Sequence, residues 1–201
     1  SKITNFEKLQ IGALATANTM DVSKLVSDGI IITGDTGTAT TLTGFSSGDT
    51  IEISLAGDMT DVLTPTIGNA TSLLNTTDTL NIKANDDIAT QGSAAAATEY
   101  KLSIAGIETL NFEATDSNSA TGAATDGYIA TLTNDTSLTT LTVTGSREFS
   151  YTTTTATKLA TVDASAATGG VIIDASGLNG IDMTITGGAQ NDTLTGSDNA
   201  D

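Results

Sequence analysis

The segment DTLNIKAND at residues 78–86 recurs as ETLNFEATD at residues 108–116, with Thr, Leu, Asn, Ala and Asp repeated at a spacing of 30. The cores of both segments alternate apolar and polar residues, which is the two-residue period of a β-strand with one buried face. Thr, Ile and Val are abundant in the chain, whereas 20 Gly residues and a single Pro punctuate it. The pattern therefore predicts equivalent strands in a repetitive all-β chain.

Further copies of this strand core lie on both sides of the pair. GDTIEIS at 48–54 and TTLTVTG at 139–145 carry the same apolar, polar, apolar alternation, and the opening stretch ITNFEKLQI matches IAGIETLNF at 104–112. We therefore expect a repeat unit to begin at the first residue. The aligned threonines are Thr50, Thr79, Thr109 and Thr140, at spacings of 29, 30 and 31 residues.

The regular period predicts how these strands assemble. A lone short strand cannot bury its apolar face, whereas copies stacked at a fixed period bury a continuous core. The expected fold is a parallel β-helix or a related β-solenoid, with an antiparallel β-sandwich as the alternative. We expect rungs of about 30 residues over 1–155. Narrower rungs are expected over 156–201, where Asp-Ala-Ser recurs 11 residues apart, at 163–165 and 174–176.

Composition excludes several classes of function. The chain of 201 residues has 7 Lys and Arg against 24 Asp and Glu, a net charge of −17, so it lacks the basic surface that nucleic acid requires. His, Cys and Trp are absent, which removes disulfides, thiol nucleophiles, imidazole bases and zinc sites. A polysaccharide hydrolase or lyase working with Asp pairs is the remaining enzyme alternative. We expect no catalysis, because aromatic residues that would stack on sugars make up only 3 %.

Targeting signals are not visible in the sequence. No stretch of 18 apolar residues is present, and no apolar run of the kind that a secretory signal needs follows the N-terminal residues. We therefore expect no transmembrane segment. An export signal would have to lie elsewhere, for example in a C-terminal address.

One motif near the end of the chain carries chemistry. GGAQNDTLT at 187–195 fits the nine-residue pattern G-G-x-G-x-D-x-U-x at four of its five specified positions, and a second unit begins at Gly196. Glycines permit a tight turn that exposes carbonyl oxygens, the Asp adds a carboxylate, and Leu194 points inward from a short strand. Calcium prefers six to eight such oxygens. The motif therefore predicts Ca²⁺ as the cofactor.

This motif, with the longer stretch VIIDASGLNGIDMTITGGAQNDTLTG at 171–196, resembles the repeats-in-toxin family and more closely its Gram-negative surface-layer branch. The resemblance implies a calcium-binding β-roll at the C-terminal end, type I secretion and an extracellular, cell-surface location. Gln190 departs from the pattern, which has Gly there. The implied metal-site residues are Gly187, Gly188, Asp192, Gly196 and Asp201, with backbone oxygens of Ala189 and Gln190 and with Asp182, ten residues before Asp192.

Other acidic residues give weaker predictions. Glu7, Asp49, Asp78 and Glu108 each precede a repeat core, so stacking would align four carboxylates that a cation could neutralise. Turn residues directed into water are the favoured interpretation of these four. The oxygen-rich pairs, for which we also expect solvated loops, are Asp58 with Asp61, Asp86 with Asp87, Asp116 with Asn118, and Asn134 with Asp135.

Together these features predict a structural segment of a bacterial surface layer. Its expected partners are copies of itself, and regions outside this chain could anchor it to outer-membrane polysaccharide. At low intracellular calcium the acidic chain would repel itself, whereas calcium outside the cell would stabilise the fold. A surface adhesin of the same family is the alternative, which a compact loop rich in Tyr or Trp would favour.

Overall fold

The computed structural model describes residues 8–12, 17–23, 29–34, 38–55, 58–68, 77–85, 98–115 and 127–199. These residues form sixteen short β-strands and contain no helix. The odd-numbered strands are β1 (Leu9–Ile11), β3 (Ile30–Ile32), β5 (Thr50–Ile53), β7 (Thr79–Asn85), β9 (Thr109–Thr115), β11 (Thr140–Gly145), β13 (Thr161–Ala167) and β15 (Thr184–Thr186). The even-numbered strands are β2 (Asn18–Asp21), β4 (Thr40–Phe45), β6 (Leu63–Ile67), β8 (Thr98–Ser103), β10 (Tyr128–Thr133), β12 (Phe149–Thr152), β14 (Val171–Asp174) and β16 (Thr193–Thr195).

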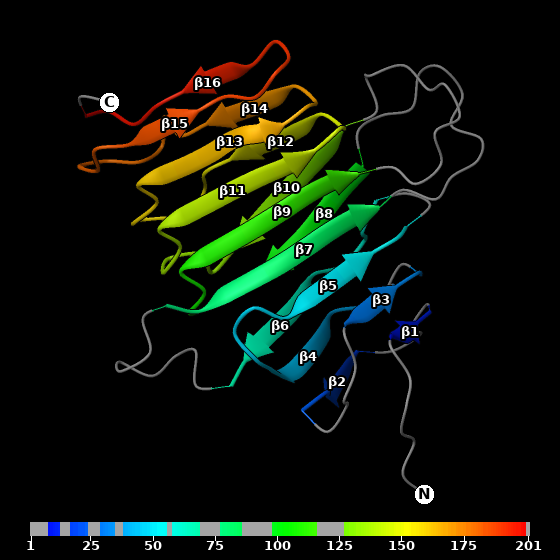
Figure 1. The fold of residues 1–201 in the computed structure, drawn as a ribbon. Helices are drawn as coiled ribbons and strands as arrows, with labels where there is room; N and C mark the ends of the chain where they lie inside the picture. Colours follow the sequence, from blue (N-terminus) through cyan, green and yellow to red (C-terminus); the bar gives the residue numbers. More distant parts are fainter. Residues whose placement is uncertain are drawn as a thin grey trace, which may run out of the picture.

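The strands form two parallel sheets that lie one behind the other (Figure 1). The odd sheet has the order β1-β3-β5-β7-β9-β11-β13-β15, and the even sheet runs in step from β2 to β16. One odd and one even strand make a rung, and each rung pairs with the next in parallel. The predicted β-solenoid is confirmed. The β-sandwich alternative is wrong, because every strand pair among the described residues is parallel.

The threonine spacing gives the register of the central rungs. Thr79, Thr109 and Thr140 occupy paired positions on β7, β9 and β11, as predicted. The predicted equivalence of Thr50 with Thr79 is wrong by two residues, because Thr50 pairs with Asn81. A shift of two residues keeps the same side chains pointing inward, so the apolar pattern alone cannot detect it.

The length of a rung varies along the chain. Paired residues are 30 or 31 positions apart from β5 to β11, as in Thr79 with Thr109. In the same sheet they are 21 apart at the N-terminal end, as in Leu9 with Ile30, and 21 to 23 apart beyond β11, as in Thr140 with Thr161 and Thr161 with Thr184. Many of the additional residues in the central rungs fall in 69–76, 86–97 and 116–126, outside the described ranges. The division of the chain near residue 155 stays a prediction.

Alternating side chains from both sheets fill one continuous core. On β7 and β9, Leu80 and Leu110 are stacked and fully buried, and the burial alternates strictly along each strand. Aromatic residues gather at the centre, where Phe112 lies 6.0 Å from Tyr100 and 4.8 Å from Phe149 between ring centroids. Stacking of this kind buries an apolar face that no single rung could bury alone.

The two sheets differ in continuity. Seven residue pairs join β7 to β9 in the odd sheet, whereas only Leu63 with Leu102 joins β6 to β8 in the even sheet. Pro65 is buried within β6 and has no backbone N–H to donate. This break leaves the odd sheet with the longer uninterrupted outer face.

Candidate functional site

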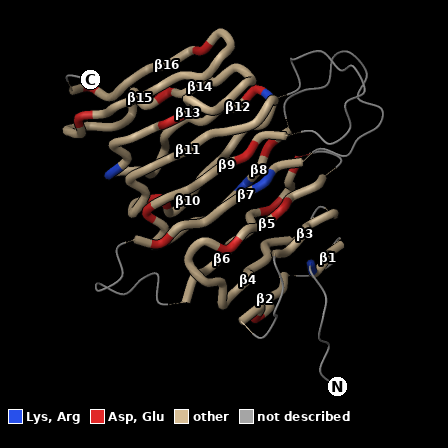
Figure 2. Tube along the Cα trace, viewed as in Figure 1, with Lys and Arg blue, Asp and Glu red and all other residues tan. Residues whose placement is uncertain are grey.

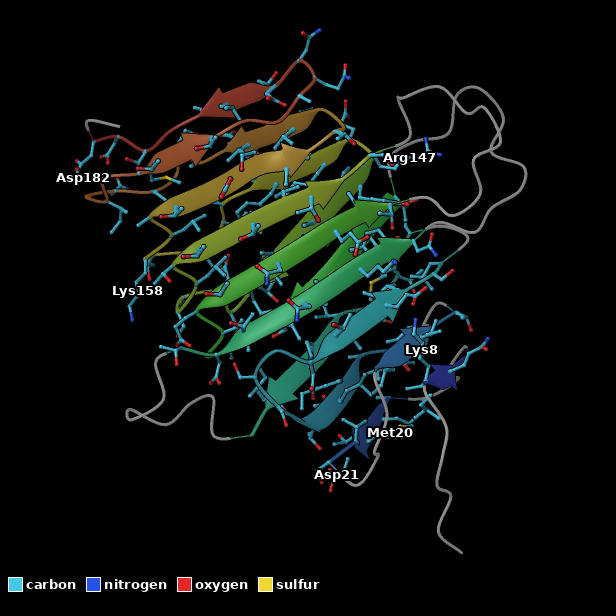
Figure 3. The ribbon with its side chains drawn as sticks, viewed as in Figure 1. Lys8, Met20, Asp21, Arg147, Lys158 and Asp182 are labelled. Atoms are coloured by element: carbon cyan, nitrogen blue, oxygen red, sulfur yellow. The ribbon has the colours of Figure 1, made fainter. Side chains whose placement is uncertain are left out.

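The turns of the solenoid stack along two opposite edges. Turns that follow odd strands form the odd-to-even edge, where Arg147 lies, and turns that follow even strands form the even-to-odd edge, where Lys158 and Asp182 lie (Figure 3). Each edge therefore brings together residues that are about one rung apart in the sequence.

This arrangement divides the residues predicted to bind metal. Gly187, Gly188, Ala189, Gln190 and Asp192 share one turn between β15 and β16, on the odd-to-even edge. The other predicted residues do not join them. Asp182 precedes β15 and Gly196 follows β16, both on the even-to-odd edge, and Asp201 lies outside the described residues.

The carboxylate of Asp192 connects its own turn to the rung below. Its Oδ2 accepts a hydrogen bond of 2.7 Å from the backbone N–H of Gly188. Its Oδ1 accepts one of 2.9 Å from the backbone N–H of Val171, the first residue of β14. Asp192 thus satisfies two backbone donors where adjacent rungs meet, and each oxygen keeps a second lone pair.

The glycine pair of the motif is required by close packing. A Cβ on Gly187 would lie 2.2 Å from Oδ2 of Asp192, and a Cβ on Gly188 would lie 2.6 Å from the carbonyl oxygen of Ala167. That carbonyl also accepts a hydrogen bond of 3.0 Å from the backbone N–H of Ala189. The motif therefore seats this turn directly on the turn after β13.

The turn after β16 stacks in a similar way on the turn after β14. Oδ1 of Asp198 accepts a hydrogen bond from the backbone N–H of Gly180, 18 residues earlier, at 3.1 Å. The side-chain amide of Asn199 donates to Oδ1 of Asp182 at 3.2 Å. Asp182 is exposed, so its carboxylate tethers two neighbouring turns at the surface.

These contacts limit how calcium could bind at Asp192. The described ranges contain no group of three or more His, Cys, Asp or Glu side chains placed to hold a metal ion. A calcium ion needs six to eight oxygens. The carboxylate of Asp192 could supply one or two, and the remainder would have to come from backbone carbonyls and water.

Only part of the predicted column of acidic residues lies together. Asp78 and Glu108 are neighbours, and Oε2 of Glu108 accepts a hydrogen bond of 2.8 Å from the backbone N–H of Asp78. Asp78 is buried, so the expectation of a solvated turn residue is wrong there. Asp49 is displaced by the two-residue shift of β5, and Glu7 lies outside the described residues.

The oxygen-rich pairs have different surroundings. Asp58 is exposed, and its Oδ1 accepts a hydrogen bond of 2.8 Å from the backbone N–H of Glu99. The pairs Asp86 with Asp87 and Asp116 with Asn118 lie outside the described residues.

Asp135, one of the residues in the oxygen-rich pairs, has surroundings that the sequence did not predict. It was expected in a solvated loop, but it is fully buried. Its carboxylate accepts hydrogen bonds from the hydroxyls of Tyr151, at 2.7 Å, and Thr155. Burial, followed by the negative charge of Asp135 and this hydrogen bond, raises the pKa of Tyr151 well above its ordinary value. Nothing in the spacing around Asn134 and Asp135 distinguishes this buried turn from an exposed one.

The recurring Asp-Ala-Ser has a local structural role. Oδ1 of Asp163 accepts a hydrogen bond of 2.9 Å from the backbone N–H of Ser165 on β13. Oδ1 of Asp174 accepts one of 3.0 Å from the backbone N–H of Ser176, which follows β14. Hydrogen bonds from these serines lower the pKa of each Asp. The two copies of the motif lie on consecutive strands, one in each sheet. In both copies the serine stabilises the ionised form of the carboxylate.

Comparisons with known proteins were made for the whole chain. Neither a protein-family model, nor a curated protein, nor a solved structure matches it. In the part of the chain that the structure describes, no helix has the length and apolar character needed to cross a membrane.

Proposed function

We propose that this chain is a structural, non-catalytic segment of a bacterial surface layer, which folds with calcium outside the cell and assembles with copies of itself. The observation that carries the proposal is the stack of turns at the C-terminal end. There Asp192, in the turn that matches the calcium-binding nonapeptide pattern, accepts a hydrogen bond from Val171 of the preceding rung. In the next turn Asp198 accepts a hydrogen bond from Gly180, 18 residues earlier, and 18 residues is the length of two nonapeptides.

Charge supports the dependence on calcium. Acidic residues occur on both sheets and at both edges, and few basic residues accompany them (Figure 2). A net charge of −17 opposes folding into a narrow stack, because self-repulsion destabilises a compact state. A divalent cation that binds the folded chain adds stability as its concentration rises above the dissociation constant. Millimolar calcium outside the cell would therefore favour the stacked form.

The shape of the molecule supports a structural role. A solenoid presents long, flat outer faces of regular composition, and here they are rich in Thr and carry few large apolar side chains. Such faces suit repeated lateral contacts between copies. Large aromatic side chains, the usual anchors of a binding interface, are buried in the core at Tyr100, Tyr128 and Tyr151. This favours assembly over the adhesin alternative.

The test is assembly of the 201-residue chain in millimolar calcium and in chelator, followed by light scattering and electron microscopy. We expect large, regular assemblies that form with calcium and dissolve when chelator is added. Magnesium at the same concentration controls for general screening of charge. A chain that stays monomeric in calcium would contradict the proposal, and binding to a glycan surface without self-assembly would favour the adhesin.

A further inference from the structure

The outer surface of the odd sheet, here called the odd face, carries columns of mostly polar side chains. They are in register from β3 to β11, and a β-bulge shifts the register between β11 and β13. Three columns run across its central strands, and each column occupies one position of the strand. The first holds Thr79, Thr109, Thr140, Thr161 and Thr184; the second holds Thr50, Asn81, Asn111, Thr142, Asp163 and Thr186; the third holds Ile31, Glu52, Lys83, Glu113, Thr144 and Ala166.

The third column alternates in charge. Glu52, Lys83 and Glu113 lie on the consecutive strands β5, β7 and β9 at paired positions. Nζ of Lys83 is 3.8 Å from Oε1 of Glu113, and these side chains are 39 % and 44 % exposed. A contact this long and this exposed contributes little within one molecule. Both charges therefore remain available to a partner.

The threonine column is also available. The hydroxyls of Thr79, Thr109 and Thr140 make no hydrogen bond to any other residue that the structure describes. Elsewhere in the same fold, Thr115 and Thr133 direct their hydroxyls to carbonyl oxygens of the rung below. The centre of the odd face thus presents a row of threonine hydroxyls that are not hydrogen-bonded to described residues of the same chain.

The columns are complementary to themselves under a two-fold rotation. The two-fold axis would lie in the interface, parallel to the strands and midway between β7 and β9. The strands of the second copy would then face those of the first in reverse order, so that β7 faces β9 and β5 faces β11. Lys83 would then face Glu113 of the other copy, Asn81 would face Asn111, and Thr79 would face Thr109. One rung further out, Glu52 would meet Thr144, and Ile31 would meet Ala166 beyond that. In these columns no acidic residue is placed opposite another.

We propose that the odd face is the surface through which two copies of this chain bind each other, face to face, about this two-fold axis. The proposal rests on self-assembly as the proposed function and identifies the contact. The six strands around the axis, β3 to β13, have 3, 4, 7, 7, 6 and 7 residues. At a rise of about 3.3 Å per residue and a spacing of about 4.8 Å between strands, they cover roughly 540 Å² per copy. This is somewhat below the usual 800 Å² or so per partner. The contact is therefore weak, as a layer with several contacts per copy requires.

The even face is less suitable for this contact. Its pairing is interrupted between β6 and β8, and Ile129, one of its outward residues, is exposed without an equivalent column of paired charges. Lys101 and Glu99 lie on the same strand of this face, 3.5 Å apart, so their charges do not alternate from rung to rung. They nevertheless provide a matched control for charge reversal.

The test is a charge swap read by sedimentation velocity in millimolar calcium. Lys83→Glu and Glu113→Lys are each expected to raise the dimer dissociation constant about tenfold, because each places like charges opposite each other. The double variant restores the Lys–Glu pairing and should return to within about twofold of the unsubstituted chain. Lys101→Glu is the control and should leave association unchanged. Far-UV circular dichroism confirms that every variant keeps its β-structure.

The outcomes separate this proposal from the proposed function. If the unsubstituted chain associates in calcium and the single reversals leave its dissociation constant unchanged, the odd face is not the contact, while self-assembly stands. Failure of the double variant to recover would likewise reject the two-fold pairing of Lys83 with Glu113. If the unsubstituted chain does not associate at all, both the contact and the proposed function are rejected.

Discussion

Asp192 shows how one side chain can hold two rungs together. Its two carboxylate oxygens accept hydrogen bonds from the backbone N–H groups of Gly188, in its own turn, and Val171, in the adjacent rung. Asp192→Ala leaves both donors without this partner, so we expect the free energy of unfolding to fall by about 1–3 kcal/mol. Asp182→Ala is the control, because Asp182 is exposed and, among the residues that the structure describes, its carboxylate accepts a hydrogen bond only from the side chain of Asn199. Its effect should stay below about 0.5 kcal/mol. Equal losses in urea unfolding would contradict this role.

The carboxylate of Asp135 and the hydroxyl of Tyr151, which donates a hydrogen bond to it, should be energetically coupled. Asp135→Ala leaves the buried hydroxyl of Tyr151 without its acceptor, and we expect a loss of about 2–4 kcal/mol. Tyr151→Phe removes the donor instead and should cost less. A double-mutant cycle measures the interaction, which we expect to be about 1–3 kcal/mol. Additive losses, within about 0.5 kcal/mol, would show that the two groups do not stabilise each other.

Glu52 gives the fold a dependence on pH. Burial raises its pKa, but hydrogen bonds from Lys8 and Asn85 and the charges of Lys8 and Lys83 outweigh burial and lower it. Its ionised form therefore stabilises the fold above the unfolded pKa of about 4.3, and this contribution is lost as pH falls through the lower folded pKa. The melting temperature of Glu52→Gln should lie below that of the unsubstituted chain at neutral pH and approach it in acid. A difference independent of pH would refute this.

Among the elements, the odd strands could be predicted from the sequence repeat more accurately than the even strands and the turns. The period of 30 placed Thr79, Thr109 and Thr140 correctly, because side chains that stack in register are repeated in sequence. The even strands share little sequence, and the two-residue shift at Thr50 preserves the apolar alternation, so neither could be predicted. The turn at Asp192 was recognisable from its glycines, whereas the buried Asp135 had no local signal.

Close stacking of turns gives a prediction for single glycines. Gly145 has a φ of 103°, and a Cβ there would lie 2.0 Å from the carbonyl oxygen of Ala114 on the rung below. Gly145→Ala should therefore destabilise the fold by more than about 2 kcal/mol. Gly12→Ala is the matched control, because nothing lies within 4 Å of its added Cβ, and it should change stability by less than about 0.5 kcal/mol. Similar melting temperatures for the two variants would contradict direct stacking.

For the whole molecule, burial of one apolar core stabilises the fold, whereas repulsion among the excess negative charges destabilises it. Sixteen short strands share a continuous apolar interior, and the sequence carries a net charge of −17. The solenoid was predictable because the repeat and the strand alternation agree. Of the proposed calcium site, only the turn was predictable from the sequence, because the remaining oxygen ligands would come from main-chain carbonyls and water, which no residue type reveals.

Stabilisation of the solenoid by calcium can be measured as the melting temperature of the 201-residue chain, followed by circular dichroism, as calcium is raised from chelator to millimolar concentration. Sodium at matched ionic strength separates binding from screening. We predict that the melting temperature rises steadily with the logarithm of calcium concentration above the dissociation constant, and that chelator reverses the rise. A melting temperature that follows ionic strength alone, identical in calcium and sodium, would contradict a calcium-stabilised solenoid.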